Sequence, residues 1–354
     1  MRTHRLCPGL RPVQYDALRQ APDGSDVYLR AQPLRRLQDH VRDREDPLHE
    51  GEHGGSSGRA GHGEEIAAVA EQFLVKGMKF VHFSEYSVLM SVYHKEKPEY
   101  LRQAMESIYD QTVKTNDFIL VCDGPLNEAL DKVIAEKQQE MGNVLHVVRL
   151  AKNGGLGNAL NEGIKHCRNE LIARMDSDDI SYPDRCERQL KVFQLHPEIS
   201  ICSGIVEEFS KCSDVVDTRR IPPETSEEIR HFAKKRNPFN HPCVMYKKSA
   251  IMAVGSYQDF YLLEDYYLWL RMLMAGNQGY NLQEPLLHMR AGAGMYKRRG
   301  GWQYFKTQRK LFTYMKEKGF IGEKEYIESC FIRSTASLAP NWIRKLLYTW
   351  LLRK

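Results

Sequence analysis

Between residues 87 and 175, short β-type segments alternate with helical ones, and this alternation constrains the fold more than any other feature of the chain. We expect strands at 87–93, 118–122, 144–150 and 170–175, and helices at 98–110, 126–141 and 155–167. In the first of these helices Leu101, Met105 and Ile108 share one face, and Pro98 occupies the tolerated first turn. Strands that alternate with helices predict an α/β fold with a mostly parallel sheet flanked by helices.

Polar residues follow three of the expected strands. Tyr93, Asp123 and Asp176 each stand where a strand ends. In open α/β sheets, ligands bind beyond the carboxyl ends of the strands. We therefore expect these three side chains to share one crevice.

The run Asp176-Ser177-Asp178-Asp179 places three carboxylates within four residues. Their mutual repulsion is relieved if a divalent cation binds between them, and hard oxygen ligands suit Mg²⁺ or Mn²⁺. A diphosphate leaving group needs such a cation, because negative charge develops on its oxygens as the bond breaks. The alternative is a solvated acidic turn or a helix cap, since residues 180–183 are able to begin a helix.

A second acidic pair, Glu264-Asp265, lies within an aromatic and apolar helical stretch at 262–271. A carboxylate at the edge of an apolar pocket is a good general base, because desolvation raises its pKa. The alternative is an ion pair with Arg271 or a capping role.

The glycine-rich run at 153–158 follows an expected strand and opens an expected helix, so its backbone amides are placed to face a ribose or a phosphate. It matches neither the dinucleotide-binding pattern nor the Walker pattern, and a plain tight turn is the alternative.

Composition excludes several classes of protein. The net charge of +5 is spread over 51 basic and 46 acidic residues, so no nucleic acid partner is expected. The eight cysteines form no C-x-x-C pair, which favours free thiols in a reducing cytosol over a zinc site or a disulfide framework. No apolar run approaches the roughly 18 residues of a membrane-spanning helix, and no signal peptide is recognisable. We expect a cytoplasmic protein.

The two ends of the chain differ from its middle. The first 75 residues contain ten Arg and no Lys, and they offer few apolar clusters. We therefore expect 1–77 to be disordered, with a short helix possible at 64–75, or else to precede the native start at Met78. Residues 341–354 form an amphipathic stretch with basic flanks, which either contacts a membrane surface peripherally or packs on the domain.

Taken together and in order, these motifs resemble glycosyltransferase family two, of the bacterial surface and capsular polysaccharide type. The resemblance covers about 87–300. It rests on seven stretches in the family's order: Ser91 to Glu96, Ser107 to Thr112, Val121 to Gly124, Asn153 to Gly163, Ala173 to Asp179, Asn240 to Pro242, and Glu264 to Arg271.

The resemblance implies a glycosyltransferase A-type fold over 78–300, with a donor half at about 86–179, an acceptor half at about 180–300 and a helical region at 301–354. It also implies roles for individual residues. Those that would hold the nucleotide sugar are Tyr93, Glu96, Asp123, Gly155 and Asp176. Asp176 and Asp178 would hold the metal, and Asp265 would be the catalytic base.

The family inverts the anomeric configuration, which implies direct displacement without a covalent glycosyl enzyme. We expect Mn²⁺ or Mg²⁺, a nucleotide diphosphate sugar, namely a UDP-sugar, as donor, and a saccharide or lipid-linked acceptor. The Q-x-x-R-W motif of processive relatives is absent, which favours transfer of one sugar per encounter. The expected place is the cytoplasm, with possible peripheral contact on the inner face of the plasma membrane.

Three other functions compete with this interpretation. A sugar-nucleotide pyrophosphorylase would carry a basic glycine-rich loop after the first strand, where this chain has Tyr93-His94-Lys95-Glu96. A phosphatase of the D-x-D-x-T type would place its aspartates after the first strand and use one as nucleophile. A non-catalytic protein that binds a nucleotide sugar or a saccharide remains the alternative from another class.

Overall fold

The computed structural model describes residues 19–20, 26–27, 83–291 and 301–338, with side chains placed in the last segment up to residue 333. The chain divides into two units, Met1–Val81 and His82–Lys354. In the first, β1 (Arg19–Gln20) pairs antiparallel with β2 (Asp26–Val27). Apart from this pair, the expectations for 1–77 and for 341–354 fall on residues outside those described.

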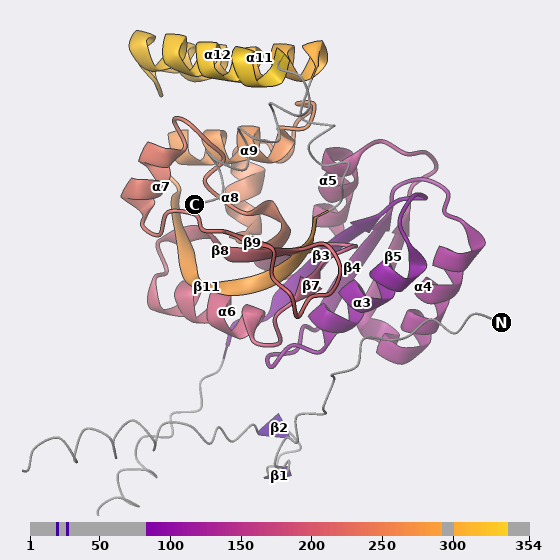
Figure 1. Cartoon of the computed structure of the whole chain (residues 1–354). Coiled ribbons are helices and arrows are strands. Elements are labelled where there is room, and N and C mark those ends of the chain that lie inside the picture. Colours follow the sequence, from indigo (N-terminus) through magenta and orange to yellow (C-terminus); the bar gives the residue numbers. More distant parts are fainter. Residues whose placement is uncertain (1–18, 21–25, 28–82, 292–300, 339–354) are drawn as a thin grey trace, which may run out of the picture. The chain divides into compact units, whose positions relative to one another are not determined.

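The second unit is built on a mixed sheet whose strands follow the order β5-β4-β3-β6-β10-β8-β11-β7, with β9 paired to β8 (Figure 1). The strands are β3 (Tyr86–Val92), β4 (Asp117–Cys122), β5 (Leu145–Arg149), β6 (Leu171–Asp176), β7 (Ile180–Ser181), β8 (Ile199–Phe209), β9 (Thr218–Arg220), β10 (Met245–Lys247) and β11 (Gln278–Arg290). Strands β3 to β6 are parallel to one another. The expected mostly parallel sheet is confirmed, and β10 enters it antiparallel to both of its neighbours.

Helices flank this sheet at the positions that the sequence predicts for its first half. They are α3 (Pro98–Tyr109), α4 (Glu128–Met141), α5 (Leu156–His166), α6 (Arg185–Leu195), α7 (Ser226–Phe232), α8 (Lys248–Ala253), α9 (Glu264–Met274), α11 (Trp302–Glu317) and α12 (Glu323–Leu338). Helix α4 begins later than expected because the Asn127 side chain caps it, accepting a hydrogen bond from the Leu130 amide at 3.0 Å. Among the described residues, no helix is long and apolar enough to cross a membrane.

Alternate residues of the central strands belong to two hydrophobic clusters on opposite faces of the sheet. Val88 and Met90 point into the cluster that contains α3, α4 and α6 residues. Leu89, between them, belongs to the cluster that contains residues of α5, α9 and α11. This two-sided burial is why the strands are almost continuously apolar.

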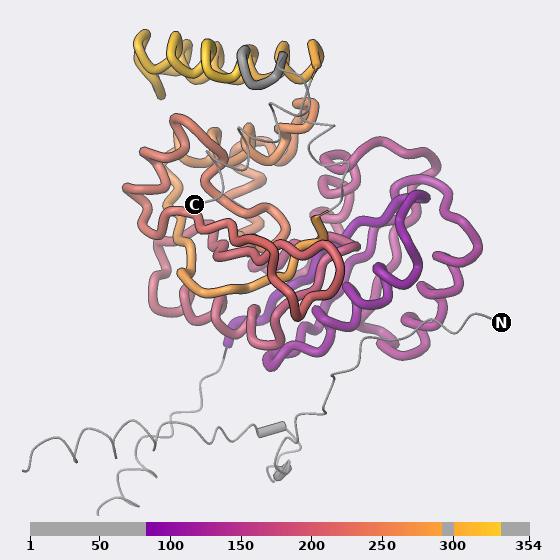
Figure 2. Tube along the Cα trace, viewed as in Figure 1, coloured from indigo at the N-terminus to yellow at the C-terminus, as the bar shows by residue number. Residues whose placement is uncertain are grey.

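The second half of the sheet joins segments that are distant in the sequence. Strand β11 runs parallel to β8 along most of its length, with Met289 opposite Glu208, and Figure 2 shows how the chain returns to place them together. The end of β11 thereby reaches the turn after β6, since the Arg290 amide donates to Asp179 Oδ1 at 2.9 Å.

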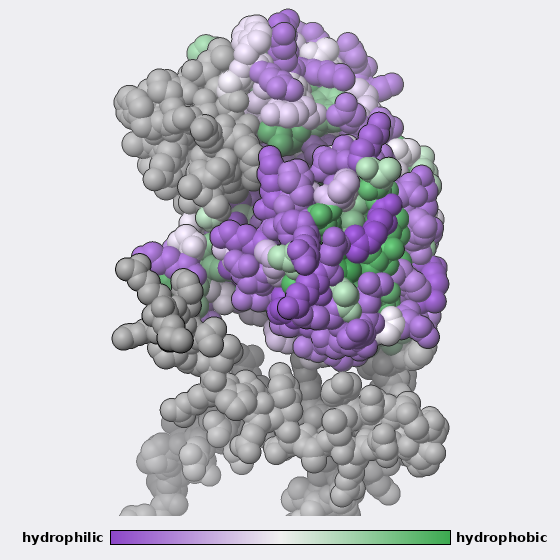
Figure 3. Space-filling model, turned by 90° about the vertical axis from the view of Figure 1, so that its right-hand side faces the viewer, coloured by the Kyte–Doolittle hydropathy of each residue, from purple (hydrophilic) through white to green (hydrophobic). Residues whose placement is uncertain are grey.

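The described residues on one face of this unit are largely polar. Figure 3 looks from the side on which α4 and α5 lie in Figure 1, and there hydrophilic residues surround a smaller hydrophobic patch. The seven described cysteines are all free thiols, as expected from their spacing.

Candidate active site

Three adjacent parallel strands bring the sequence-predicted residues to one edge of the sheet. Strand β3 lies between β4 and β6, with Val92 opposite Cys122 and Ser91 opposite Asp176. Tyr93 and Asp123 directly follow the first two strands, and Asp176 is the last residue of the third. The three residues therefore stand at neighbouring strand ends, and the crevice expected between them stays a prediction. The order of the strands reverses at β3, which is where ligands bind in open α/β sheets.

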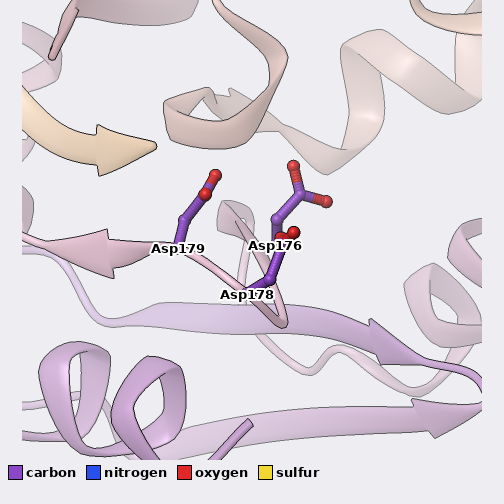
Figure 4. Close-up of side chains that lie close together, drawn as sticks. All are labelled: Asp176, Asp178 and Asp179. Carbon is purple, nitrogen blue, oxygen red and sulfur yellow. The ribbon is translucent and has the colours of Figure 1, made fainter. Parts of the chain in front are cut away.

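The acidic cluster Asp176, Asp178 and Asp179 forms the centre of this edge. One carboxylate oxygen from each residue lies within 4.8 Å of the others. The three side chains project to the same side of the turn between β6 and β7 (Figure 4). Because the three residues offer only hard oxygen ligands, the cluster fits Mg²⁺ or Mn²⁺ better than a softer metal.

Burial and mutual repulsion raise the pKa values of two of these carboxyls. The pKa of Asp178 rises to about 7, first because the group is buried and then because the charges of Asp176 and Glu96 are near. Burial also holds the pKa of Asp179 well above its usual range, and the neighbouring aspartates add to this effect. A bound divalent cation would offset this repulsion.

Arg174 lies beneath the cluster and was not singled out by the sequence analysis. Its side chain is only 1% exposed, and its guanidinium forms two hydrogen bonds with the carboxylate of Asp176, one of them 2.8 Å long. The sequence signal that could have identified Arg174 is its spacing of two residues from Asp176, since residues two apart on a strand point to the same face. Arg174 Nε has no hydrogen-bond partner among the described residues.

Asp123 anchors the glycine-rich turn. Its Oδ1 accepts a hydrogen bond from the Gly154 amide at 2.7 Å, and its Oδ2 accepts one from the Gly155 amide at 3.0 Å. The backbone at Gly124 also lies close to the glycine-rich turn, because a Cβ on Gly124 would lie 2.6 Å from Asn153 N. Gly155 has φ +86° and immediately precedes α5, so only glycine adopts this conformation without strain. Asp123 and Gly155, both expected to contact the nucleotide, therefore lie together, but the amides of Gly154 and Gly155 donate to Asp123 and not to the expected ribose or phosphate.

Glu96 and Tyr93 complete the edge on the side of β3. Glu96 Oε2 accepts a hydrogen bond from the Ser177 hydroxyl at 3.2 Å, which ties the segment after β3 to the acidic turn. The Tyr93 side chain is exposed, and its ring meets His94 edge-on. An exposed aromatic ring beside a carboxylate suits contact with a nucleoside.

Glu264 and Asp265 begin α9. The sequence left open an ion pair between one of these carboxylates and Arg271. No such pair is present among the described residues, and Arg271 donates instead to the carbonyl oxygens of Val254 and Ser256. Asp265 Oδ2 accepts a hydrogen bond from the Asn237 side chain at 2.7 Å. Burial raises the pKa of Glu264 to about 6, helped by the charges of Asp265 and Asp259.

Tyr257 lies near both acidic groups and contacts His241. The Tyr257 hydroxyl and His241 Nε2 are 2.9 Å apart. Burial raises the pKa of Tyr257, and both Asp265 and Asp176 lie near enough to add to the effect. Burial, together with the charge of Arg174, lowers the pKa of His241 well below its usual value, so its ring is neutral. His241 belongs to the stretch Asn240 to Pro242, for which the sequence predicted no individual role, and no motif marked Tyr257.

Known proteins match this chain over the same region. The family model described as glycosyl transferase family 2 matches residues 87–259. The chain is 38% identical to the amylovoran biosynthesis glycosyltransferase AmsE of Erwinia amylovora, over 74% of this chain and 97% of that protein. It is 36% identical to the UDP-Gal:alpha-D-GlcNAc-diphosphoundecaprenol beta-1,3-galactosyltransferase of Escherichia coli, over 76% of this chain and 97% of that protein.

A solved structure supports the fold. The mannosyltransferase PcManGT of Pyrobaculum calidifontis, in complex with GDP-Man and Mn²⁺, superposes with a TM-score of 0.51 at 13% identity, over 81% of this chain and 86% of that one. This likeness confirms the glycosyltransferase A-type fold that the motif resemblance implied. The extent and identity of the sequence matches show that the chain belongs to glycosyltransferase family 2 and is a glycosyltransferase.

Proposed function

We propose that the chain is an inverting, non-processive and metal-dependent glycosyltransferase of surface polysaccharide biosynthesis. It moves one sugar from a nucleotide diphosphate donor, a UDP-sugar, to a saccharide or lipid-linked acceptor. The acidic cluster carries this proposal, because three carboxylates within 4.8 Å of one another stand at the strand ends where a nucleotide binds.

Asp176 and Asp178 are the residues that would hold the cation, Mn²⁺ or Mg²⁺. When bound, the cation would neutralise the charge that develops on the departing diphosphate. The Mn²⁺ in the complex of PcManGT with GDP-Man supports this choice. The name of the E. coli relative, which specifies UDP-Gal, supports a UDP-sugar as donor.

The glycine-rich turn, Glu96 and Tyr93 would hold the nucleoside. Asp123 fixes the amides of Gly154 and Gly155, so the turn is preorganised before the donor arrives. Residues 86–179 would then form the donor half of the catalytic region 78–300, and residues 180–300 its acceptor half.

Asp265 would be the general base. It takes the proton from the acceptor hydroxyl, and the hydroxyl oxygen attacks the anomeric carbon of the donor sugar. The bond from that carbon to the diphosphate oxygen breaks, and the electron pair leaves with the nucleoside diphosphate. One displacement inverts the configuration, and no protein nucleophile is required.

The acceptor is a saccharide, free or linked to a lipid diphosphate. The name of the E. coli relative specifies such a diphosphate-linked acceptor, and AmsE is named for the synthesis of amylovoran. We further propose that the reaction takes place on the cytoplasmic side, with the enzyme in peripheral contact with the membrane.

Release of nucleoside diphosphate tests the proposal. The full chain is incubated with a panel of UDP-sugars, with Mn²⁺ or with EDTA, and the UDP formed is measured. We expect slow release from at least one UDP-sugar with Mn²⁺ and none with EDTA. Absence of UDP release from every UDP-sugar of the panel, with and without Mn²⁺, would contradict the proposal and favour a non-catalytic protein that binds a nucleotide sugar or a saccharide.

A further inference from the structure

The positive charge of the chain is concentrated in one stretch. Residues 285–316 contain eight Lys or Arg and no Asp or Glu, whereas the whole chain has a net charge of only +5. A run of this kind marks a surface that meets anions. Helix α11 (Trp302–Glu317) occupies the second half of it.

One face of α11 packs into the hydrophobic core, and another face lines a groove. Tyr304, Leu311 and Met315 are buried in the helix's core-facing stripe. The neighbouring face carries Lys306, Arg309 and Lys310, which line a groove of about 600 Å³ between α11 and residues 258–267. The basic residues of α11 therefore converge on a concave surface.

None of these three cations has a carboxylate partner within 4.0 Å in the part of the chain that the structure describes. Like charges three and four residues apart on a helix repel, and each pair costs about 0.2–0.5 kcal/mol. Asp259 and Glu317 also line the groove. Three cations against two carboxylates leave it positive, and a bound anion would relieve the repulsion.

Aromatic rings form the floor of the groove. The rings of Phe260 and Tyr267 lie 4.5 Å apart, and Tyr314 meets Tyr267 edge-on at 5.0 Å. Lys310 Nζ lies 4.9 Å from the centre of the Phe260 ring. Aromatic faces beside cations suit a ligand that combines an apolar or sugar surface with phosphate groups.

The groove borders the loop that leads to α9. Residues 258–260 line the groove, and the preceding Tyr257 lies close to Gly157, where a Cβ would be 3.6 Å from Tyr257 Cβ. Asp259 is close enough to Glu264 to contribute to its raised pKa. One short loop therefore separates the groove from the residues that begin α9, the proposed base among them.

We propose that this groove binds the diphosphate of a lipid-linked acceptor, with Lys306, Arg309 and Lys310 as its ligands and the aromatic floor against the adjoining lipid or sugar. This inference rests on the proposed function, because it assigns the acceptor's diphosphate to a place in the same enzyme. The choice of a diphosphate follows the name of the E. coli relative, which specifies a diphosphate-linked acceptor.

Undecyl diphosphate, a soluble probe for that head group, tests the inference by calorimetry on the full chain saturated with UDP and Mn²⁺, so that the metal site is occupied. The triple variant K306Q/R309Q/K310Q should bind it at least about tenfold more weakly, equivalent to 1.4 kcal/mol. The control K132Q/K318Q/K324Q removes three exposed lysines outside the groove, and it should bind as the wild type does.

A groove variant that binds the probe as tightly as the wild type would overturn the inference. An equal loss of probe affinity in the groove variant and in the control variant would also overturn it. Equal binding of wild type and groove variant to phosphatidylglycerol vesicles is expected. Selective loss of vesicle binding by the groove variant, with probe binding intact, would instead identify a membrane surface and refute the groove's role. Donor hydrolysis with Mn²⁺ and no acceptor separates the two proposals: it should persist in the groove variant, and its absence from the wild type would contradict the proposed function alone.

Discussion

Replacing Arg174 with Gln should destabilise the fold, because it leaves the carboxylate of Asp176 without its buried partner. Breaking a buried ion pair costs about 3–5 kcal/mol. Asp176 retains 30% exposure, so water recovers part of that cost and we expect a loss of about 2–3 kcal/mol. For a domain of this size the melting temperature should fall by about 5–10 °C.

Urea unfolding in EDTA, followed by tryptophan fluorescence, measures this loss without a contribution from bound metal. The control is Arg149→Gln, because Arg149 also pairs with an aspartate, Asp131, but the two side chains are 52% and 41% exposed. An ion pair exposed on both sides contributes little to stability, so the control should cost less than about 1 kcal/mol. If the two variants lose the same stability, Arg174 does not hold the acidic cluster as described.

Three further predictions concern α9 and the end of the chain. Asp265→Asn keeps the shape of the base but cannot accept a proton, so turnover should fall by about 10²–10⁴ while UDP binding persists, and near-normal turnover would exclude Asp265. The pKa of Glu264 is about 6 when folded against an ordinary 4.5, so the folded state binds more protons between these values and stability falls as pH rises through them. Glu264→Gln should therefore gain about 1–2 kcal/mol in urea unfolding at pH 7 and nothing at pH 4, and a loss at pH 7 would refute the argument. Deleting 341–354 should abolish co-sedimentation with anionic liposomes and leave melting temperature intact, whereas unfolding would assign the segment to the core.

The first half of the fold was accessible from the sequence because its signals are local. The strands are short, almost continuously apolar runs, and the helices between them keep a helical period. The rule that ligands bind at strand ends then indicates the residues that follow or end β3, β4 and β6. The positions of Tyr93, Asp123 and Asp176 at one edge followed from this rule alone.

The second half was less predictable because its pairings are not local. Strand β8 is buried along its full length, and its pairing with β11, about 80 residues later, leaves no mark in the local pattern. The same applies to Arg174, whose role depends on burial beneath Asp176, and to Tyr257, which reaches the site only through the fold. A buried arginine in a strand looks like an exposed one until its neighbours are known.

The central claim is that the acidic cluster holds a divalent cation that binds the donor's diphosphate. Calorimetric titration of UDP, and separately of GDP, into the wild type and into Asp178→Ala measures this directly, each with Mn²⁺ and with EDTA. The account predicts that one nucleotide binds the wild type at least about tenfold more tightly with Mn²⁺ than with EDTA, a difference of 1.4 kcal/mol, and that Asp178→Ala shows no such difference. A wild-type affinity that is the same with and without Mn²⁺ would contradict the account.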